Sequence, residues 1–186
     1  MMRKATHIYI GIFLVNLFVT PLVFSQETTK EVSDQPAINW ISFEEAVKKN
    51  KKKPRKIFID VYTDWCGWCK KMDRETFRDA AVVDYINKNY YAVKFNAEQK
   101  EPVKFKGQEF LSTDPAKPKA VHQLAIALLK QELRYPSYVI LDGESEWLYK
   151  VKGYKTTEDL LPILRYYGSN QYKVMSWSEF NELKTL

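Results

Sequence analysis

The chain has 186 residues, of which 45% are hydrophobic and 15% are aromatic. This composition is sufficient for a single apolar core and excludes a disordered chain. Beyond the first 25 residues the chain carries 27 basic and 23 acidic residues, a small excess that indicates no particular class of partner. Two cysteines are too few for a disulfide framework, so the hydrophobic core must stabilise the fold.

The N-terminus has the pattern of a secretory signal peptide at residues 1–25. Arg3 and Lys4 form a basic start, an apolar run extends from 8 to 24, and we expect cleavage before Gln26. An uncleaved membrane anchor is the alternative, but the run is short for a transmembrane helix and no cationic flank follows it. We therefore expect an exported protein of the periplasm or cell envelope that is not inserted in a membrane after cleavage.

A polar lead-in at 26–37 precedes a region of alternating helices and strands. The expected elements, in chain order, are a helix at 42–50, a strand at 56–62, helices at 70–75 and 79–89, a strand at 91–95, a helix at 121–129, strands at 137–141 and 147–151, and a helix from 156 or 157 to 168. This alternation is typical of an α/β fold in which helices flank a central mixed β-sheet.

Two segments lie outside this alternation. The polar stretch at 97–119 is long for a simple connection and predicts an Ω-loop or a small hairpin. Residues 168–186 form a C-terminal extension, in which we expect one short helix from Ser178 to Lys184.

Two polar features could carry function but have simpler structural explanations. Seven basic residues at 48–56 could bind nucleic acid, yet the run lacks interleaved aromatic residues and fits the solvated end of a helix. His122 lies beside the apolar stripe of the predicted helix at 121–129, where we expect a surface histidine rather than a catalyst. We therefore predict no nucleic-acid partner and no catalytic histidine.

The only two cysteines, Cys66 and Cys69, lie where the predicted strand at 56–62 gives way to a helix. At a helix N-terminus, unpaired N–H groups and the macrodipole favour an anion, so we expect Cys66 to ionise readily. A disulfide across two intervening residues closes too short a loop to stabilise the fold much, which indicates a reactive pair. Structural zinc needs about four ligands, and the chain after the signal offers two thiols and one histidine. We expect no metal.

Further residues around the cysteines match a known pattern. Asp60 lies six positions before the first cysteine, Lys94 lies on the following strand, and Tyr135-Pro136-Ser137 forms an X-Pro-Ser step. The other matches are the Trp-Cys-Gly-Trp-Cys-Lys motif at 65–70 and the turn glycines Gly143 and Gly153. Together these features resemble the thioredoxin superfamily over residues 38–167. The tryptophan before the second cysteine is most similar to exported thioredoxin-like proteins and to the thioredoxin-like domain of thiol:disulfide interchange proteins.

The resemblance implies a thioredoxin fold with an inserted loop and a C-terminal helical extension, and it implies roles for four residues. Cys66 would be the nucleophile that attacks a substrate disulfide, and Cys69 would resolve the mixed disulfide. Asp60, an acid within an otherwise apolar strand, would accept or relay the proton of Cys69, and Lys94 would modulate the pKa of Asp60. No cofactor is implied beyond the Cys66–Cys69 disulfide.

The resemblance also implies four residues that contact the substrate. Trp65 and Trp68 would flank the sulfurs, with plain packing as their alternative role. Tyr135 and Pro136 would line the groove for the substrate backbone, and the peptide bond between them is predicted to be cis. Trp68 replaces the proline that is usual in the family motif, so the reduction potential of the family does not carry over.

Together these features predict thiol–disulfide exchange on protein substrates. We favour a reductase, regenerated by a redox partner, because Gly67 and the acid at 60 resemble thioredoxin more than strong oxidants; an oxidase or an isomerase would use the same site. The alternative of a different class is a redox-inert thioredoxin-fold module that binds proteins through 97–119 and the C-terminal extension. We expect a monomer.

Overall fold

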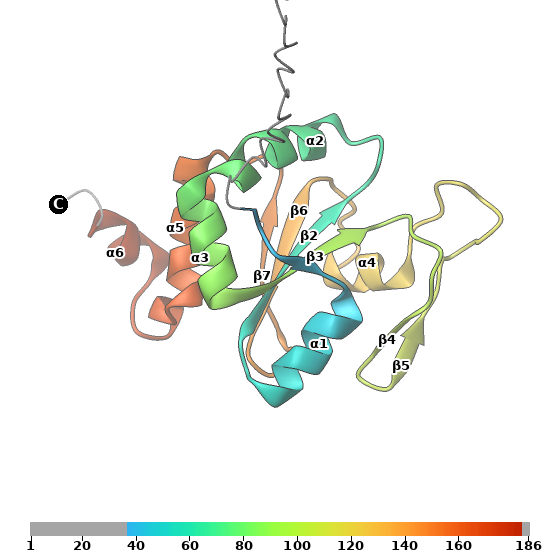
Figure 1. Ribbon diagram of the computed structural model, residues 1–186, viewed down its shortest axis with the longest axis horizontal. Helices are drawn as coiled ribbons and strands as arrows, with labels where there is room; N and C mark the ends of the chain where they lie inside the picture. The colour runs from blue at the N-terminus through green and yellow to red at the C-terminus, as the bar shows by residue number, and fades with distance from the viewer. Residues whose placement is uncertain (1–36, 184–186) are drawn as a thin grey trace, which may run out of the picture. The chain divides into compact units, whose positions relative to one another are not determined.

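The computed structural model describes residues 37–183, so the predicted signal peptide at 1–25 and the lead-in up to residue 36 lie outside the described residues. The central sheet has five strands in the order β1-β3-β2-β6-β7 (Figure 1). Its strands are β1 (Trp40–Ile41), β2 (Lys56–Tyr62), β3 (Tyr90–Asn96), β6 (Ser137–Leu141) and β7 (Trp147–Lys152). The pairs β1–β3 and β2–β3 are parallel, and β2–β6 and β6–β7 are antiparallel, which confirms the predicted mixed sheet.

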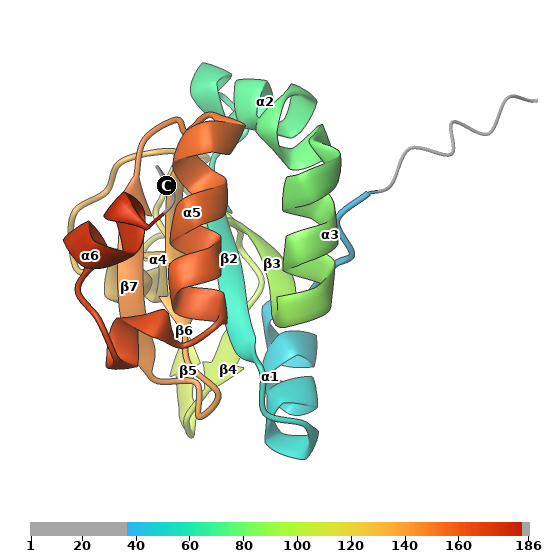
Figure 2. The ribbon, with the colours of Figure 1, turned by 90° about the vertical axis from the view of Figure 1, so that its left-hand side faces the viewer.

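Helices cover both faces of this sheet (Figures 1 and 2). The covering helices are α1 (Phe43–Lys52), α2 (Gly67–Arg74), α3 (Ala80–Asn89), α4 (Gln123–Leu128) and α5 (Thr157–Gly168), and a further helix, α6 (Trp177–Glu182), lies outside α5. On one face, α1 and α4 bury apolar residues such as Phe43 and Leu124 in a common cluster. On the other, α2, α3 and α5 do the same with residues such as Met72, Ile86 and Leu160.

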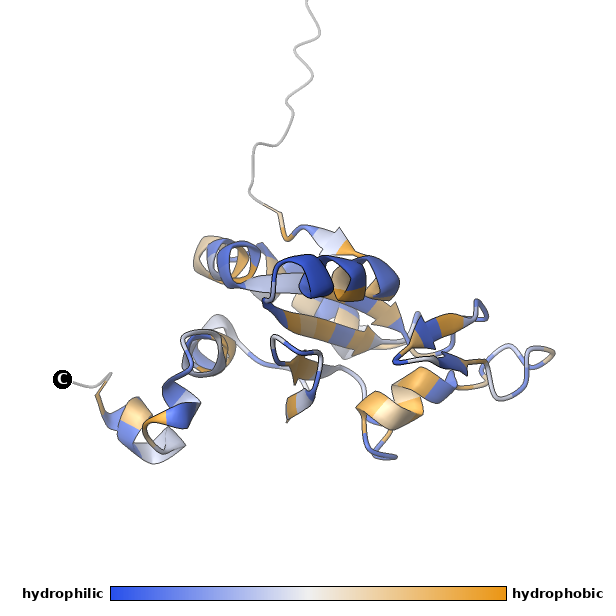
Figure 3. Ribbon diagram, turned by 90° about the horizontal axis from the view of Figure 1, so that it is seen from below, coloured by the Kyte–Doolittle hydropathy of each residue, from blue (hydrophilic) through white to orange (hydrophobic). Residues whose placement is uncertain are grey.

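The central strand β2 divides its side chains between these two clusters. Ile57, Ile59 and Val61 point to the α1–α4 face, and Phe58 points to the α2–α3–α5 face. Because strand side chains alternate between faces, Asp60 lies on the same face as Phe58, beneath α2. In Figure 3 the strands of the sheet are largely hydrophobic, which makes a carboxylate within β2 unusual.

The polar stretch at 97–119 contains a small hairpin rather than an Ω-loop. Its strands are β4 (Val103–Phe105) and β5 (Gln108–Phe110), which pair in antiparallel register. The two turn residues, Lys106 and Gly107, have φ angles of 50° and 79°. Two consecutive positive φ angles are typical of the tight turns that match the twist of a hairpin, and glycine adopts them without steric cost.

Several helix boundaries differ from the predictions. The helix after the cysteines begins at Gly67 rather than residue 70 and ends at Arg74, before a 3₁₀ turn at Thr76–Arg78. The helix predicted at 121–129 is shorter, Gln123–Leu128. In the C-terminal extension α6 is capped by Ser176, and the prediction of Ser178 was wrong because Glu179 completes a capping box with Ser176.

His122 is fully buried, so the prediction of a surface histidine was wrong. Its Nδ1 accepts a hydrogen bond from the backbone N–H of Leu124 at 3.1 Å, which caps α4. The other ring nitrogen, Nε2, lies 3.1 Å from the backbone oxygen of Glu101. His122 lies between the stretch at 97–119 and α4, where it caps the helix, and it therefore has a structural role.

The C-terminal extension continues from α5 through a 3₁₀ turn, Gln171–Lys173, into α6. It packs on the domain through Tyr166, whose ring contacts those of Trp177 and Phe180 at centroid distances of 5.3 and 5.1 Å. Within residues 37–183, none of the helices has the length and apolar character needed to cross a bilayer.

Candidate active site

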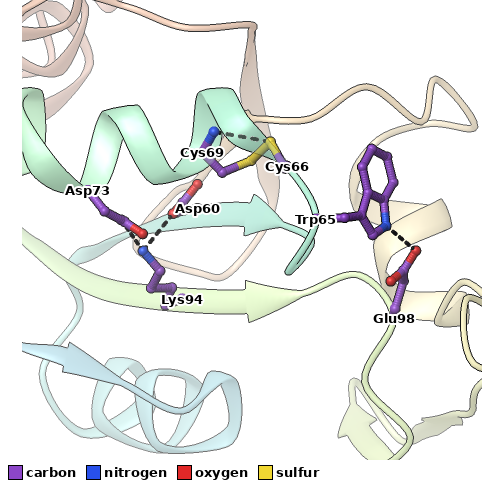
Figure 4. The surroundings of a disulfide bond; sticks show 7 residues. All are labelled: Asp60, Trp65, Cys66, Cys69, Asp73, Lys94 and Glu98. Atoms are coloured by element: carbon purple, nitrogen blue, oxygen red, sulfur yellow. Dashed lines mark hydrogen bonds and ion pairs between the residues drawn. A yellow bond between two sulfur atoms is a disulfide. The ribbon is translucent and has the colours of Figure 1, made fainter.

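The two cysteines form a disulfide at the start of α2 (Figure 4). Cys66 is the N-cap residue: its backbone N–H donates to the oxygen of Thr63 at 3.1 Å, and its Sγ accepts the N–H of Cys69 at 3.1 Å. This confirms that the first cysteine lies at a helix N-terminus, where a backbone N–H donates to its sulfur. The cysteines are 5% and 3% exposed, so a partner reaches the disulfide over a small area.

Asp60 lies beneath the disulfide and is 1% exposed (Figure 4). Its Oδ2 is 3.5 Å from Nζ of Lys94, whereas its Oδ1 has no hydrogen-bond partner among residues 37–183. Burial raises the pKa of Asp60 from 3.8 to about 7; the charge of Lys94 opposes this rise and the charge of Asp73 adds to it. A carboxyl group with a pKa near neutrality can both accept and return a proton at physiological pH.

Lys94 holds a central position between two acids. It is the cross-strand neighbour of Asp60 on β3, and its ammonium also bonds to Asp73 on α2. Three rings surround the ammonium, those of Trp40, Tyr62 and Phe77, with centroids at 5.4, 5.2 and 5.9 Å. Aromatic faces attract an ammonium group, so the three rings help to hold the Lys94 side chain beside the buried acid.

Asp73 was not among the predicted site residues. Its side chain is 41% exposed, so Lys94 connects the buried Asp60 to a carboxylate at the surface. A signal for it existed: Asp73 follows Cys69 by four residues, which places the two on one face of a helix.

Trp65 and Trp68 both have exposed rings, at 56% and 58% of their maximal areas. Trp65 donates its indole N–H to Oε1 of Glu98 at 2.9 Å (Figure 4). Trp68 packs against Tyr154 with ring centroids 5.4 Å apart, and the ammonium of Lys71 lies 5.5 Å from its ring centre. The two tryptophans therefore border the disulfide without belonging to the core.

Tyr135 and Pro136 are joined by a cis peptide bond, as predicted. The ring of Tyr135 meets that of Trp65 edge to face, at a centroid distance of 6.0 Å, so the proline step lies next to the redox motif. Burial, followed by the charge of Glu98, raises the pKa of Tyr135 to about 12.

The insertion contributes two residues to this site that were not predicted. Glu98 lies at its start and accepts the indole N–H of Trp65, and Lys119 lies at its end with Nζ 5.8 Å from the same ring centre. Both are ordinary charged residues in a polar stretch, and no spacing or motif marks them. Only the path of the insertion brings them to the tryptophan.

The described residues contain no group of three histidine, cysteine, aspartate or glutamate side chains placed to hold a metal ion.

Comparisons with known proteins give a consistent result. A family model for the thioredoxin-like domain matches residues 43–168. The thiol:disulfide interchange protein DsbD of Pectobacterium atrosepticum is 29% identical over 68 residues, which cover 37% of this chain and only 11% of that protein. An uncharacterized protein of Archaeoglobus fulgidus is 29% identical over 103 residues, which cover 54% of this chain and 74% of that protein.

A solved structure described as a thioredoxin-fold protein from Helicobacter pylori aligns with a TM-score of 0.53 and 17% identity. The alignment covers 71% of this chain and 86% of that one. At this identity the likeness shows the fold alone, and it agrees with the sheet order and helix layers described above.

Proposed function

Because the chain belongs to the thioredoxin-like domain family, we propose that it catalyses thiol–disulfide exchange on protein substrates, as a reductase that acts through Cys66 and Cys69. One observation carries the proposal: the cysteine pair begins helix α2 directly above a buried acid, Asp60, whose pKa is about 7. A purely structural disulfide would need neither an anion-binding helix terminus nor a costly buried carboxyl group beside it.

In the first step, the thiolate of Cys66 attacks one sulfur of the substrate disulfide. A mixed disulfide forms, and the other substrate sulfur leaves as a thiolate that takes up a proton. We assign the attack to Cys66 because its Sγ caps the N-terminus of α2 and accepts the backbone N–H of Cys69, an environment that stabilises a negative charge.

In the second step, Cys69 attacks the Sγ of Cys66 and releases the second substrate sulfur. The substrate gains two electrons and two protons, and the protein is left with the Cys66–Cys69 disulfide. Cys69 must first lose its thiol proton, and Asp60 is placed to accept it. Lys94 stabilises the carboxylate form of Asp60, and so it lowers the pH at which Asp60 can begin to accept that proton.

The substrate contacts the exposed residues near the disulfide. Trp65 and Trp68, the residues that precede the two cysteines, offer exposed apolar area, and the Tyr135–Pro136 step lies beside Trp65. After each turnover the disulfide must be reduced by a redox partner. We also propose that the protein acts outside the cytoplasm, on the basis of the signal pattern at 1–25.

The experiment is reduction of insulin by the pre-reduced protein. We expect wild-type activity, loss of activity in Cys66→Ser, and covalent trapping of substrate by Cys69→Ser. Lys104→Gln is a matched control, since Lys104 is an exposed residue of the hairpin. An inactive wild type would instead support the redox-inert binding module.

Whether the protein acts as a reductase or as an oxidase is tested by measuring the equilibrium of the Cys66–Cys69 pair with glutathione. We expect a reduction potential near that of thioredoxin, about −270 mV. A value near that of strong oxidants, about −120 mV, would contradict the reductase and favour an oxidase.

A further inference from the structure

Asp60 has two cross-strand neighbours, one on each side. Lys94 on β3 is the first, and Tyr138 on β6 is the second, paired in antiparallel register. Directly paired residues of neighbouring strands point to the same face of a sheet, so Lys94, Asp60 and Tyr138 form one row beneath α2. The proposed mechanism uses the first two members of this row and leaves Tyr138 without a role.

The surroundings of Tyr138 explain its ring but not its hydroxyl group. The residue is fully buried, and its ring stacks on Phe58 at 5.7 Å and meets Phe77 edge to face at 5.8 Å. A phenylalanine would make both ring contacts. The hydroxyl has no hydrogen-bond partner among the described residues, and the same holds for Oδ1 of its neighbour Asp60. A buried polar atom without a partner is costly, and two of them on paired residues call for an explanation.

We propose that Tyr138 is a positioning residue for Asp60, whose carboxylate accepts a hydrogen bond from the Tyr138 hydroxyl, directly or through one bridging water molecule, when Asp60 is ionised. The inference rests on the proposed function, in which Asp60 receives the proton of Cys69. A neutral donor stabilises the carboxylate and adds no second positive charge beside Lys94.

The hydroxyl stays a donor over the whole working range, because burial and the nearby charge of Asp60 raise the pKa of Tyr138 well above its ordinary value. Other groups that act on Asp60 must be held constant in any test. They are Lys94 from β3, Asp73 and the cysteine pair from α2, and Tyr62 from β2.

The test is an NMR titration of the Asp60 carboxyl carbon in the oxidised protein, with Asp60→Asn to assign the signal. In Tyr138→Phe we expect the midpoint to rise by about one pH unit, the amount expected for loss of a hydrogen bond to a charged group. Tyr90→Phe is the matched control. Tyr90 is also buried in the same apolar cluster, but its hydroxyl donates to the oxygen of Leu164 at 2.7 Å, so its loss should leave the titration unchanged.

An unchanged or lowered midpoint in Tyr138→Phe would overturn the inference. Should that variant not fold, Tyr138→Leu also removes the hydroxyl and is judged by the same criterion. A second readout is the pH profile of exchange by the reduced protein, which should move with the NMR midpoint and should not move in an Asp60→Asn background. Absence of any exchange would refute the proposed function instead, and the titration of the oxidised protein would still decide the role of the hydroxyl.

Discussion

Asp60 and His122 are two buried titratable side chains in different regions of the molecule, and they differ in how completely their polar atoms are paired. His122, at the end of the insertion, has a partner at each ring nitrogen: the Leu124 N–H and the Glu101 oxygen. Asp60, beneath the redox disulfide, has one oxygen near Lys94 and one without a partner within 37–183. Burial is therefore common to a residue whose polar atoms are all paired and to one with an unpaired atom, and we base the proposed role of Asp60 on the unpaired atom.

The same contrast gives the two groups opposite dependences on pH. Burial raises the pKa of Asp60 to about 7 and lowers the pKa of His122 below its usual range. The folded protein keeps the Asp60 proton at a pH where the unfolded chain has lost it, so this group makes the fold less stable as pH rises from about 4 to 7. For His122 the unfolded chain takes up the proton first, so this group makes the fold less stable as pH falls below about 6.5.

The largest expected effect is on the stability of oxidised Asp60→Asn. Asparagine does not titrate, so the variant loses the destabilisation that Asp60 causes at high pH. Relative to its effect at pH 4, the substitution should raise the free energy of unfolding at pH 8 by about 4 kcal/mol, from the shift between 3.8 and about 7. Denaturant unfolding at the two pH values measures this, and equal effects at both would show that Asp60 is not a perturbed acid.

The same substitution should slow thiol–disulfide exchange by the reduced protein about 100-fold at neutral pH, because Cys69 loses the base that receives its proton. Stopped-flow reduction of a fluorescent disulfide peptide provides the rate. His122→Asn serves as the control for a change at a buried titratable residue and should leave the rate per folded molecule unchanged. A rate in Asp60→Asn equal to wild type would remove the acid from the mechanism.

His122→Ala should lower the free energy of unfolding at pH 8 by about 2 kcal/mol, because α4 loses its cap and the Glu101 oxygen loses a partner. This loss of stability should be smaller below pH 6.5, where the wild-type histidine itself destabilises the fold. Thermal unfolding across that range tests this. A loss that is constant with pH would mean that His122 does not titrate with folding.

Asp73→Asn should have the smallest effect, a lower midpoint for Asp60 and a change in exchange rate of less than about threefold. Asp73 raises the pKa of Asp60 through its charge and also shares Lys94 with it, so its loss leaves the ammonium to Asp60 alone. Titration of the Asp60 carboxyl in the variant gives the sign. A higher midpoint would contradict this account of how Asp73 and Lys94 act on Asp60.

Local patterns were sufficient to predict much of this molecule. The alternation of elements predicted the mixed sheet, and the helices predicted to begin at 42 and 79 do begin there, with Ser42 and Asp79 as their N-cap residues. The position of Cys66 at a helix start also followed from neighbouring residues. These features depend on backbone geometry and on contacts within a few residues, which a sequence states directly.

Other features could not be read in this way. The two-residue strand β1 has no periodicity of its own and forms only because β3 offers an edge. His122 looked like a surface residue because its partners, Ala97 and Glu101, lie more than twenty positions earlier in the chain. Charged residues in polar stretches, such as Glu98 and Lys119, carry no signal until the chain path brings them to Trp65.

By itself the sequence determined the α/β class and the place of the cysteine pair at a helix start, because each rests on residue type at short spacing, and the family resemblance implied the acid beside the pair. Only the tertiary structure decided which buried polar atoms lack a hydrogen-bond partner among the described residues. The row of Lys94, Asp60 and Tyr138, with Asp73 above it, comes from three strands and a helix. Whether a buried atom has a hydrogen-bond partner depends on every segment packed around it, and no local sequence pattern specifies all of those segments.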